Sequence, residues 1–273
     1  MAELRDQIAH HYEHDIDEDA RLRSGIGRLE LERVREIVTR VLPAAPARVL
    51  DVGGATGVHA EWLLADGHEV HLVDLLESHV ARARERLGHA DGFSAEVGDA
   101  RDLPVVDAAY DVVLLLGPLY HLQDAADRRA AWREAARAVR PGGVVVGMAI
   151  SLFASLFDGL AWGSLFDADF RAMVAADLAS GRHENPDRNP HWFTTAYFQR
   201  PDELAAEATG AGLVDVEVLG VEGAAGWLPD LGARMDDPAG RETLLWSARV
   251  VESEPSVAGL SSHVVAVGRR PVG

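Results

Sequence analysis

The sequence predicts an α/β fold in which a mainly parallel sheet is covered by helices on both faces. Strand-like and helix-like segments alternate through residues 48–150, which is the pattern of a parallel sheet with helical crossovers. The first strand ends in an acidic residue and a glycine-dense turn that leads into a helix, the usual form of a ligand crevice in such sheets. The chain has 273 residues and is 48% hydrophobic, so it can bury a substantial core.

The elements follow from the apolar periodicity and from the residues that start and stop them. A helix before the first strand is predicted at 26–42, where Leu29, Val34 and Val38 recur at helical spacing and Pro43 ends the segment. The alternating elements that follow it are strands at 48–52, 69–73, 93–97 and 110–116 and helices at 58–65, 77–87 and 125–139. A turn at Pro141-Gly142-Gly143 then leads into a strand at 144–150.

The alternation stops after residue 150. Residues 151–199 combine apolar helical stretches with a polar, turn-rich run, and we interpret them as a helical cap inserted over the carboxyl edge of the sheet. The core pattern resumes with Pro201 at the start of a helix and with strands at 214–218 and 263–267. The sequence leaves open the role of residues 229–255, which include a helix-like piece.

Composition and charge exclude several classes of function. The formal charge is -18, from 26 Lys plus Arg against 44 Asp plus Glu, so we expect no nucleic-acid partner. The lack of cysteine excludes a disulfide framework, a thiolate metal site and a cysteine nucleophile. The start of the chain is acidic, unlike a signal peptide, and the apolar runs are far shorter than the roughly 20 residues that span a bilayer. We therefore expect a cytoplasmic protein with no membrane partner.

The glycine turn at 49–57 predicts a nucleotide-type cofactor, and its details favour a cationic one. A dinucleotide site would have glycines in a G-x-G-x-x-G pattern, but Ala55 and Val58 stand where the second and third glycines belong. Asp51 at the end of the strand would add negative charge beside a diphosphate. The same carboxylate suits a ligand that carries an ammonium and a sulfonium, so charge favours S-adenosylmethionine.

Five segments resemble, in the right order, the motifs of the class I S-adenosylmethionine-dependent methyltransferases. Asp51-Val52-Gly53-Gly54-Ala55-Thr56-Gly57 is similar to motif I of that family. The other segments are Val73-Asp74-Leu75, Gly98 to Pro104, Tyr110 to Leu122 and Val139 to Gly143. The resemblance covers residues 48–150 closely. It implies a Rossmann-like sheet of seven strands with the last one antiparallel, S-adenosyl-L-methionine as cofactor, and methyl transfer to a small molecule of secondary metabolism. Oxygen is the first choice of acceptor atom, with nitrogen and carbon left open.

The resemblance also implies the cofactor contacts. Asp74 would accept hydrogen bonds from the ribose hydroxyls and Asp99 from the adenine amino group. The implied contacts are Asp51, Gly53, Gly54, Ala55, Gly57, Asp74, Leu75, Asp99, Ala100, Leu116 and Gly117, joined by Tyr12 and Arg28 from the N-terminal segment. Arg28 would pair with the methionine carboxylate. Ala55 departs from the family's usual glycine, which is tolerable if its φ is negative and would crowd the ligand otherwise.

Catalytic side chains are expected to be few, because the methyl carbon is already activated by its positive sulfur. An acceptor that carries a proton would benefit from a general base, and His121 beside Tyr120 follows the fourth strand, where the methyl group should point. The alternative is that Tyr120 and His121 only pack against the cofactor or bond to backbone. In the cap, His191, Trp192 and Tyr197 mix rings with polar groups, as a small-molecule pocket does.

No metal ligands are expected. We interpret His10, His11 and His14 as part of a solvated acidic arm, because they alternate with many acidic residues. The predicted division of the chain is an N-terminal helical lid at 1–46, the cofactor-binding core at 47–150, the substrate cap at 151–199 and the rest of the core sheet at 200–273.

Two other functions stay open on the sequence. One is a NAD-type oxidoreductase of related fold, and the other is a non-catalytic subunit that binds S-adenosylmethionine. The expected partner is a small-molecule acceptor, and a homodimer is compatible with the sequence.

Overall fold

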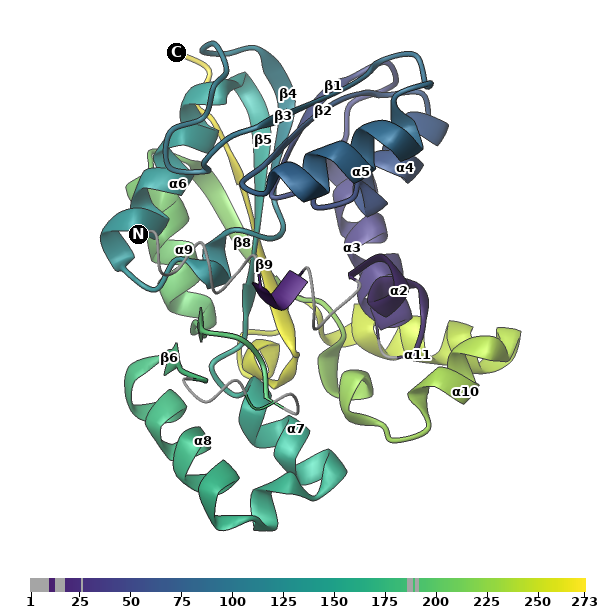
Figure 1. The fold of residues 1–273 in the computed structure, drawn as a ribbon, viewed down its shortest axis with the longest axis vertical. Helices are drawn as coiled ribbons and strands as arrows, with labels where there is room; N and C mark the ends of the chain where they lie inside the picture. The colour runs from purple at the N-terminus through teal and green to yellow at the C-terminus, as the bar shows by residue number, and fades with distance from the viewer. Residues whose placement is uncertain (1–9, 13–17, 26, 186–188, 190–191) are drawn as a thin grey trace. The chain divides into compact units, whose positions relative to one another are not determined.

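The computed structural model describes residues 10–12, 18–25, 27–185, 189 and 192–273, and its main feature is a seven-stranded sheet (Figure 1). The order of its strands is β3-β2-β1-β4-β5-β9-β8. Their bounds are β1 Arg48–Val52, β2 Glu69–Asp74, β3 Phe93–Val97, β4 Tyr110–Leu115, β5 Val139–Ile150, β8 Val214–Gly220 and β9 His263–Arg269. Two further strands, β6 Arg182–His183 and β7 Ala196–Tyr197, form a separate antiparallel pair.

Strands β1 to β5 are parallel to one another, and β9 runs against β5. The end of β5 pairs with the start of β9, since Ser151 N–H donates to Ser262 O at 2.9 Å. The start of β5 pairs with the end of β9, since Gly142 N–H donates to Arg270 O at 2.9 Å. The predicted Rossmann-like sheet with an antiparallel last strand is therefore confirmed.

The helices fall close to the predicted positions. Those of the alternating region are α3 Gly27–Val41, α4 Val58–Ala65, α5 Glu77–Leu87 and α6 Ala125–Ala138. Those elsewhere are α2 Glu18–Arg23, α7 Ala154–Trp162, α8 Ala168–Ser180, α9 Pro201–Gly210, α10 Leu231–Asp236 and α11 Pro238–Val251. In Figure 1, α4 and α5 lie on one side of the sheet and α6 on the other. Among the described residues, no helix combines the length and apolar character that crossing a membrane requires.

The chain forms two compact units. Unit 2 takes residues 35–148, 205–217 and 266–273 and contains the strands β1 to β4 with α4, α5 and α6. Its core includes Trp132 of α6, which is fully buried over β5. A Cβ atom on Gly147 would lie 2.4 Å from Trp132 Cη2, so β5 has glycine where the indole packs. Unit 1 takes residues 1–34, 149–204 and 218–265, and its core includes Leu29, Leu231 and Leu245.

Two predictions about local structure are wrong. The turn at Pro141-Gly142-Gly143 is part of β5, which begins at Val139 and bulges where its register against β4 shifts. The strand continues because Arg270 pairs with both Gly142 and Gly143 through backbone hydrogen bonds of 2.9 and 3.0 Å.

The prediction of a solvated N-terminal arm is wrong for His11. This residue is buried, with its ring 5.5 Å from that of Phe193 in an edge-on contact within unit 1. The prediction failed because it used only the acidic residues near His11 in the sequence, whereas its aromatic partner Phe193 is far along the chain. His14 lies outside the described residues, and the division of the chain into lid, core, cap and remaining sheet stays a prediction.

Candidate active site

Asp51 is the unusual residue of the site because its carboxylate is buried and finds no hydrogen-bond donor in the described part of the chain. It is the last residue but one of β1 and is fully buried. Neither of its oxygens has a hydrogen-bond partner among the described residues. Burial, and then the charge of Asp74, raise the pKa of Asp51 from 3.8 to about 7. A buried carboxylate without a donor is costly, so this position calls for a cationic or hydrogen-bonding ligand.

The glycine turn packs directly against Asp51 and against the loop that follows β4. Gly53 has a φ of 70° and extends the pairing of β1, since its N–H donates to Val73 O at 2.7 Å. A Cβ atom on Gly54 would lie 2.6 Å from Asp51 Oδ2, and one on Gly117 would lie 2.7 Å from Gly53 O. A side chain at position 54 would therefore collide with the orphaned carboxylate, and one at position 117 would collide with the backbone of the glycine turn.

The turn ends at α4 with polar groups that form no hydrogen bond to a side chain of the described residues. Gly57 is the N-cap residue of α4 and provides no side-chain hydrogen bond to the first turn. Thr56 Oγ1 is buried and has no partner among the described residues. The sequence reasoning missed Thr56, although a hydroxyl inside a glycine turn was the available signal. Asp51, Thr56 and the start of α4 together provide acceptors and donors for one ligand.

Ala55 has a left-handed backbone, with a φ of 47°. The negative φ that would make alanine tolerable here is therefore not found. The reason is a hydrogen bond of 2.9 Å from Ala55 N–H to Asp74 Oδ2, which ties the turn to the end of β2. The strained backbone is the cost of a short, closely packed turn.

Asp74 connects the two loops on which the cofactor is expected. Its Oδ1 accepts from Leu76 N–H at 2.9 Å and lies 3.1 Å from His79 Nδ1, while Oδ2 accepts from Ala55. A carboxylate oxygen can accept two hydrogen bonds, so Oδ2, which among the described residues accepts only from Ala55, can still accept from a ribose hydroxyl. Leu75 beside it is half-buried. The ribose contact stays a prediction.

Asp99 lies in the loop after β3 and is held by Arg101. The backbone N–H and Nε of Arg101 both lie 2.9 Å from Asp99 Oδ1, and Arg101 also pairs with Asp127 at 2.7 Å. The paired carboxylates raise the pKa of Arg101, with the hydrogen bond to Asp99 as the largest cause. These contacts hold the Asp99 carboxyl group in place next to the buried Ala100. Its contact with adenine stays a prediction.

Tyr120 and His121 are buried in a 3-10 turn, η2 (Leu119–His121), that follows β4, Leu116 and Gly117. The two rings are 4.7 Å apart. Arg128, which the sequence reasoning missed, donates 2.9 Å hydrogen bonds to the carbonyls of Leu122 and Gln123, directly after the turn. The structure therefore holds this loop in one position.

The predicted contacts from the N-terminal segment and the cap all lie in unit 1. Arg28 pairs with Asp236 and donates to Met235 O at 3.0 Å. Tyr197 Oη donates to Glu203 Oε1 at 2.8 Å. The rings of the other two described residues have aromatic neighbours: Tyr12 lies 5.1 Å from His11, and Trp192 lies 6.3 Å from Phe170. His191 lies outside the described residues, and the roles of all five stay predictions.

Known proteins resemble this chain in sequence and in fold. A family model described as a methyltransferase domain matches residues 49–143. The 27-O-demethylrifamycin SV methyltransferase of Amycolatopsis mediterranei is 36% identical over 152 residues, which cover 52% of this chain and 53% of that protein. The ubiquinone biosynthesis O-methyltransferase of Thiobacillus denitrificans is 32% identical over 192 residues, which cover 69% of this chain and 73% of that protein. The chain belongs to the class I S-adenosylmethionine-dependent methyltransferases. The chain spans only about half the length of the first of these relatives.

A solved structure agrees with the fold of this methyltransferase family. The phosphoethanolamine N-methyltransferase 2 of Haemonchus contortus, in complex with phosphomonomethylethanolamine and S-adenosylhomocysteine, superposes with a TM-score of 0.60. It is 17% identical, and the match covers 98% of this chain and 60% of that protein.

S-adenosylmethionine is the cofactor of the family, and the residues present fit it. Its ammonium and sulfonium are cations, and Asp51 is a buried carboxylate that lacks any partner among the described residues. Glycine at position 54 lets the turn pack against that carboxylate, since a Cβ atom there would lie 2.6 Å from Asp51 Oδ2. The prediction of this cofactor is confirmed.

Proposed function

We propose that the protein transfers the methyl group of S-adenosylmethionine to an oxygen atom of a small organic acceptor in secondary metabolism. The observation that carries this proposal is the orphaned carboxylate of Asp51 beside the glycine turn. The printed names of two relatives support oxygen as the acceptor atom, since both describe O-methylation of small molecules. The net charge of -18 supports a small acceptor over a nucleic acid.

The chemistry divides between the cofactor and a few side chains. When bound, S-adenosylmethionine supplies a methyl carbon that is activated by the sulfonium. Asp51 would hold the cationic end, and Asp74 and Asp99 would hold the ribose and the adenine. His121 would accept the proton of the acceptor hydroxyl as the oxygen bonds to the methyl carbon and the carbon–sulfur bond breaks toward sulfur. Tyr120, 4.7 Å from His121 between ring centres, would orient that imidazole.

The acceptor would be recognised by aromatic and polar residues of the cap. We place Trp192, Tyr197 and His191 among these residues. Tyr197 keeps a hydroxyl bound to Glu203 at 2.8 Å, so its ring has a defined orientation. Aromatic residues with hydrogen-bonding groups are typical of small-molecule pockets.

The test is release of S-adenosylhomocysteine in the presence of phenols, hydroxy acids, amines and carboxylic acids. We expect turnover with a hydroxyl-bearing acceptor and a decrease of about 100-fold in kcat for His121→Ala. His89→Gln, a change at an exposed histidine, is the control and should leave kcat unchanged.

Three results would contradict the proposal in different ways. Normal turnover by His121→Ala would show that positioning alone drives the transfer and would remove the base from the mechanism. Binding of NAD without binding of S-adenosylmethionine in calorimetry would indicate an oxidoreductase. Cofactor binding with no turnover on any acceptor class would favour a non-catalytic subunit.

A further inference from the structure

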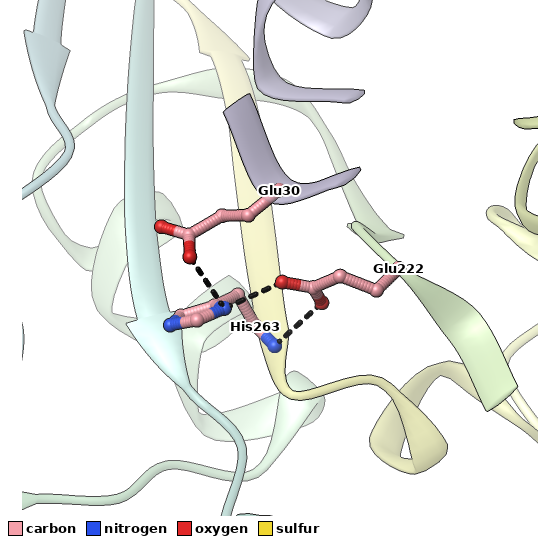
Figure 2. A group of neighbouring side chains, drawn as sticks. All are labelled: Glu30, Glu222 and His263. Atoms are coloured by element: carbon pink, nitrogen blue, oxygen red, sulfur yellow. Dashed lines mark hydrogen bonds and ion pairs between the residues drawn. The ribbon is translucent and has the colours of Figure 1, made fainter. Parts of the chain in front are cut away.

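Three charged side chains from distant parts of the sequence meet at the start of β9 (Figure 2). Glu30 comes from α3, Glu222 follows β8, and His263 is the first residue of β9, all within unit 1. His263 Nδ1 lies 2.6 Å from Glu222 Oε1 and 3.9 Å from Glu30 Oε2. Both glutamates are buried, while 16% of the His263 side chain is exposed.

The imidazole of His263 is held through Nδ1, and Nε2 has no hydrogen-bond partner among the described residues. Glu222 accepts from Nδ1, and its second oxygen accepts from the His263 backbone N–H at 3.0 Å. No described residue makes a hydrogen bond to His263 Nε2. Because the side chain is partly exposed, Nε2 can donate to a ligand.

The donors around the two carboxylates favour an imidazolium over a metal ion. Both carboxylate oxygens of Glu30 accept hydrogen bonds from Arg21: Nη1 donates to Oε2 at 2.7 Å and Nη2 donates to Oε1 at 3.0 Å. Glu222 Oε2 also accepts from Ser261 Oγ at 2.8 Å. Every carboxylate oxygen of the cluster therefore already has a proton donor, and a divalent cation would have to displace them.

The charges that face His263 keep it protonated. Burial alone would lower its pKa, but Glu30 and Glu222 outweigh burial and the opposing charge of Arg21, and they raise the pKa of His263 to about 9. Two carboxylates near one imidazole therefore produce a fixed cation at neutral pH.

The cluster lies at the edge of the sheet where ligands of this fold class bind. Ser151, directly after β5, donates from its N–H to Ser262 O at 2.9 Å, so β9 begins where β5 ends. Val221 N–H donates to His263 O at 3.0 Å and aligns the residue with β8. In open α/β sheets the ligand crevice lies outside the carboxyl ends of the parallel strands, and β5 is one of them.

We propose that His263, held by Glu222, binds the carboxylate of a small organic acid through its Nε2–H. A charge-assisted hydrogen bond from an imidazolium to a carboxylate is among the stronger polar contacts available to a protein.

The test is a nitrogen NMR titration of the imidazoles in the whole protein with 4-hydroxybenzoate, and with 4-hydroxybenzamide as the neutral match. We expect both nitrogens of His263 to be protonated at neutral pH and the Nε2–H resonance to shift with the acid only. His263→Gln should weaken binding of the acid about tenfold or more. Glu222→Gln, which keeps the size of the side chain, should lower the pKa of His263 and weaken binding as well. His89→Gln is the control and should change neither.

Several outcomes would overturn the inference. These are a neutral His263 ring at pH 7, equal shifts with the acid and the amide, or no shift with either. Stoichiometric binding of Zn²⁺ that is lost in His263→Gln would make the cluster a metal site instead.

The binding measurement needs no cofactor, so the two proposals can fail separately. Loss of methyl transfer on all acceptors, with 4-hydroxybenzoate still bound at His263, would defeat the proposed function alone. Methyl transfer to an acceptor, with no binding of 4-hydroxybenzoate at His263, would defeat this inference alone.

Discussion

At the scale of single residues, Asp51 shows how a binding site conflicts with stability. The carboxylate is buried without a partner among the described residues, so it destabilises the protein until a ligand arrives. We expect Asp51→Asn to weaken S-adenosylmethionine binding by about 10-fold to 100-fold, the value of a charge-assisted hydrogen bond. Calorimetry measures the affinity. The exposed Asp91→Asn is the control, and equal affinities of the two variants would contradict the assignment.

The same carboxyl group should make stability depend on pH. In the folded protein without cofactor the pKa of Asp51 is about 7, against 3.8 for an ordinary aspartate. Between these values the folded state holds a proton that the unfolded chain has lost. The stabilising contribution is therefore complete below pH 3.8 and disappears as the pH rises through 7.

This linkage predicts that the free energy of unfolding of the wild type, relative to Asp51→Asn, falls by up to about 4 kcal/mol across that range. Urea denaturation of both proteins at a series of pH values measures it. A difference between them that is independent of pH would show that Asp51 ionises normally. Affinity for S-adenosylmethionine should rise over the same interval, because the cation binds the ionised form.

Ala55 offers a gain of stability at the site itself. Its φ of 47° is a conformation that glycine adopts freely and alanine does not. We expect Ala55→Gly to raise the free energy of unfolding by about 1 kcal/mol and to tighten cofactor binding. Ala81→Gly, at an exposed position inside α5, should instead lower stability by about 1 kcal/mol. Thermal and urea denaturation compare the two, and the same sign for both changes would refute the argument from backbone strain.

At the scale of elements, a buried ion pair joins α6 to α9. Its arginine, Arg128, also holds the loop that contains His121. Arg128 Nε lies 2.9 Å from Glu207 Oε1, and both side chains are buried. We expect Arg128→Met to cost about 3–5 kcal/mol, because it leaves a buried carboxylate unpaired. The double change with Glu207→Met should recover much of this loss. Urea denaturation measures both, and the exposed Arg129→Met should stay within about 0.5 kcal/mol of wild type.

Most elements of the parallel part of the sheet were predictable from the sequence, because their hydrophobic patterns are local. The helices α4 and α5 and the strands β1 and β3 have the predicted bounds. The start of β5 was not predictable, since Pro141 and two glycines are typical of a turn. The hydrogen bonds that keep it in the sheet come from Arg270, far along the chain.

The sequence predicted the site only where its residues are contiguous in one segment. The motif around Asp51 identified the cofactor, because strand, acidic residue and turn are contiguous. The left-handed φ of Ala55 depends on a hydrogen bond to Asp74, and the cluster at His263 depends on Glu30 and Glu222. Such contacts join residues that are distant in sequence and leave no periodic signal in it.

At the scale of the whole molecule, the two units share strands. The boundary between them falls inside β5, between Met148 and Ala149, and inside β9, between Val265 and Ala266. Separable domains are joined by exposed linkers rather than by continuous strands. We therefore expect one cooperative unfolding transition, with stabilisation of either unit shared by both.

The six tryptophans can test this expectation, because Trp62 and Trp132 lie in unit 2 and Trp162, Trp192, Trp227 and Trp246 lie in unit 1. Fluorine NMR of protein labelled with fluorotryptophan follows each indole during a urea titration. S-adenosylhomocysteine at 100 times its dissociation constant should stabilise the folded state by about 2.7 kcal/mol. The predicted cofactor contacts Asp51, Asp74 and Asp99 are all in unit 2, yet all six resonances should move to the same higher midpoint. A shift confined to Trp62 and Trp132 would mean that the shared strands do not couple the units.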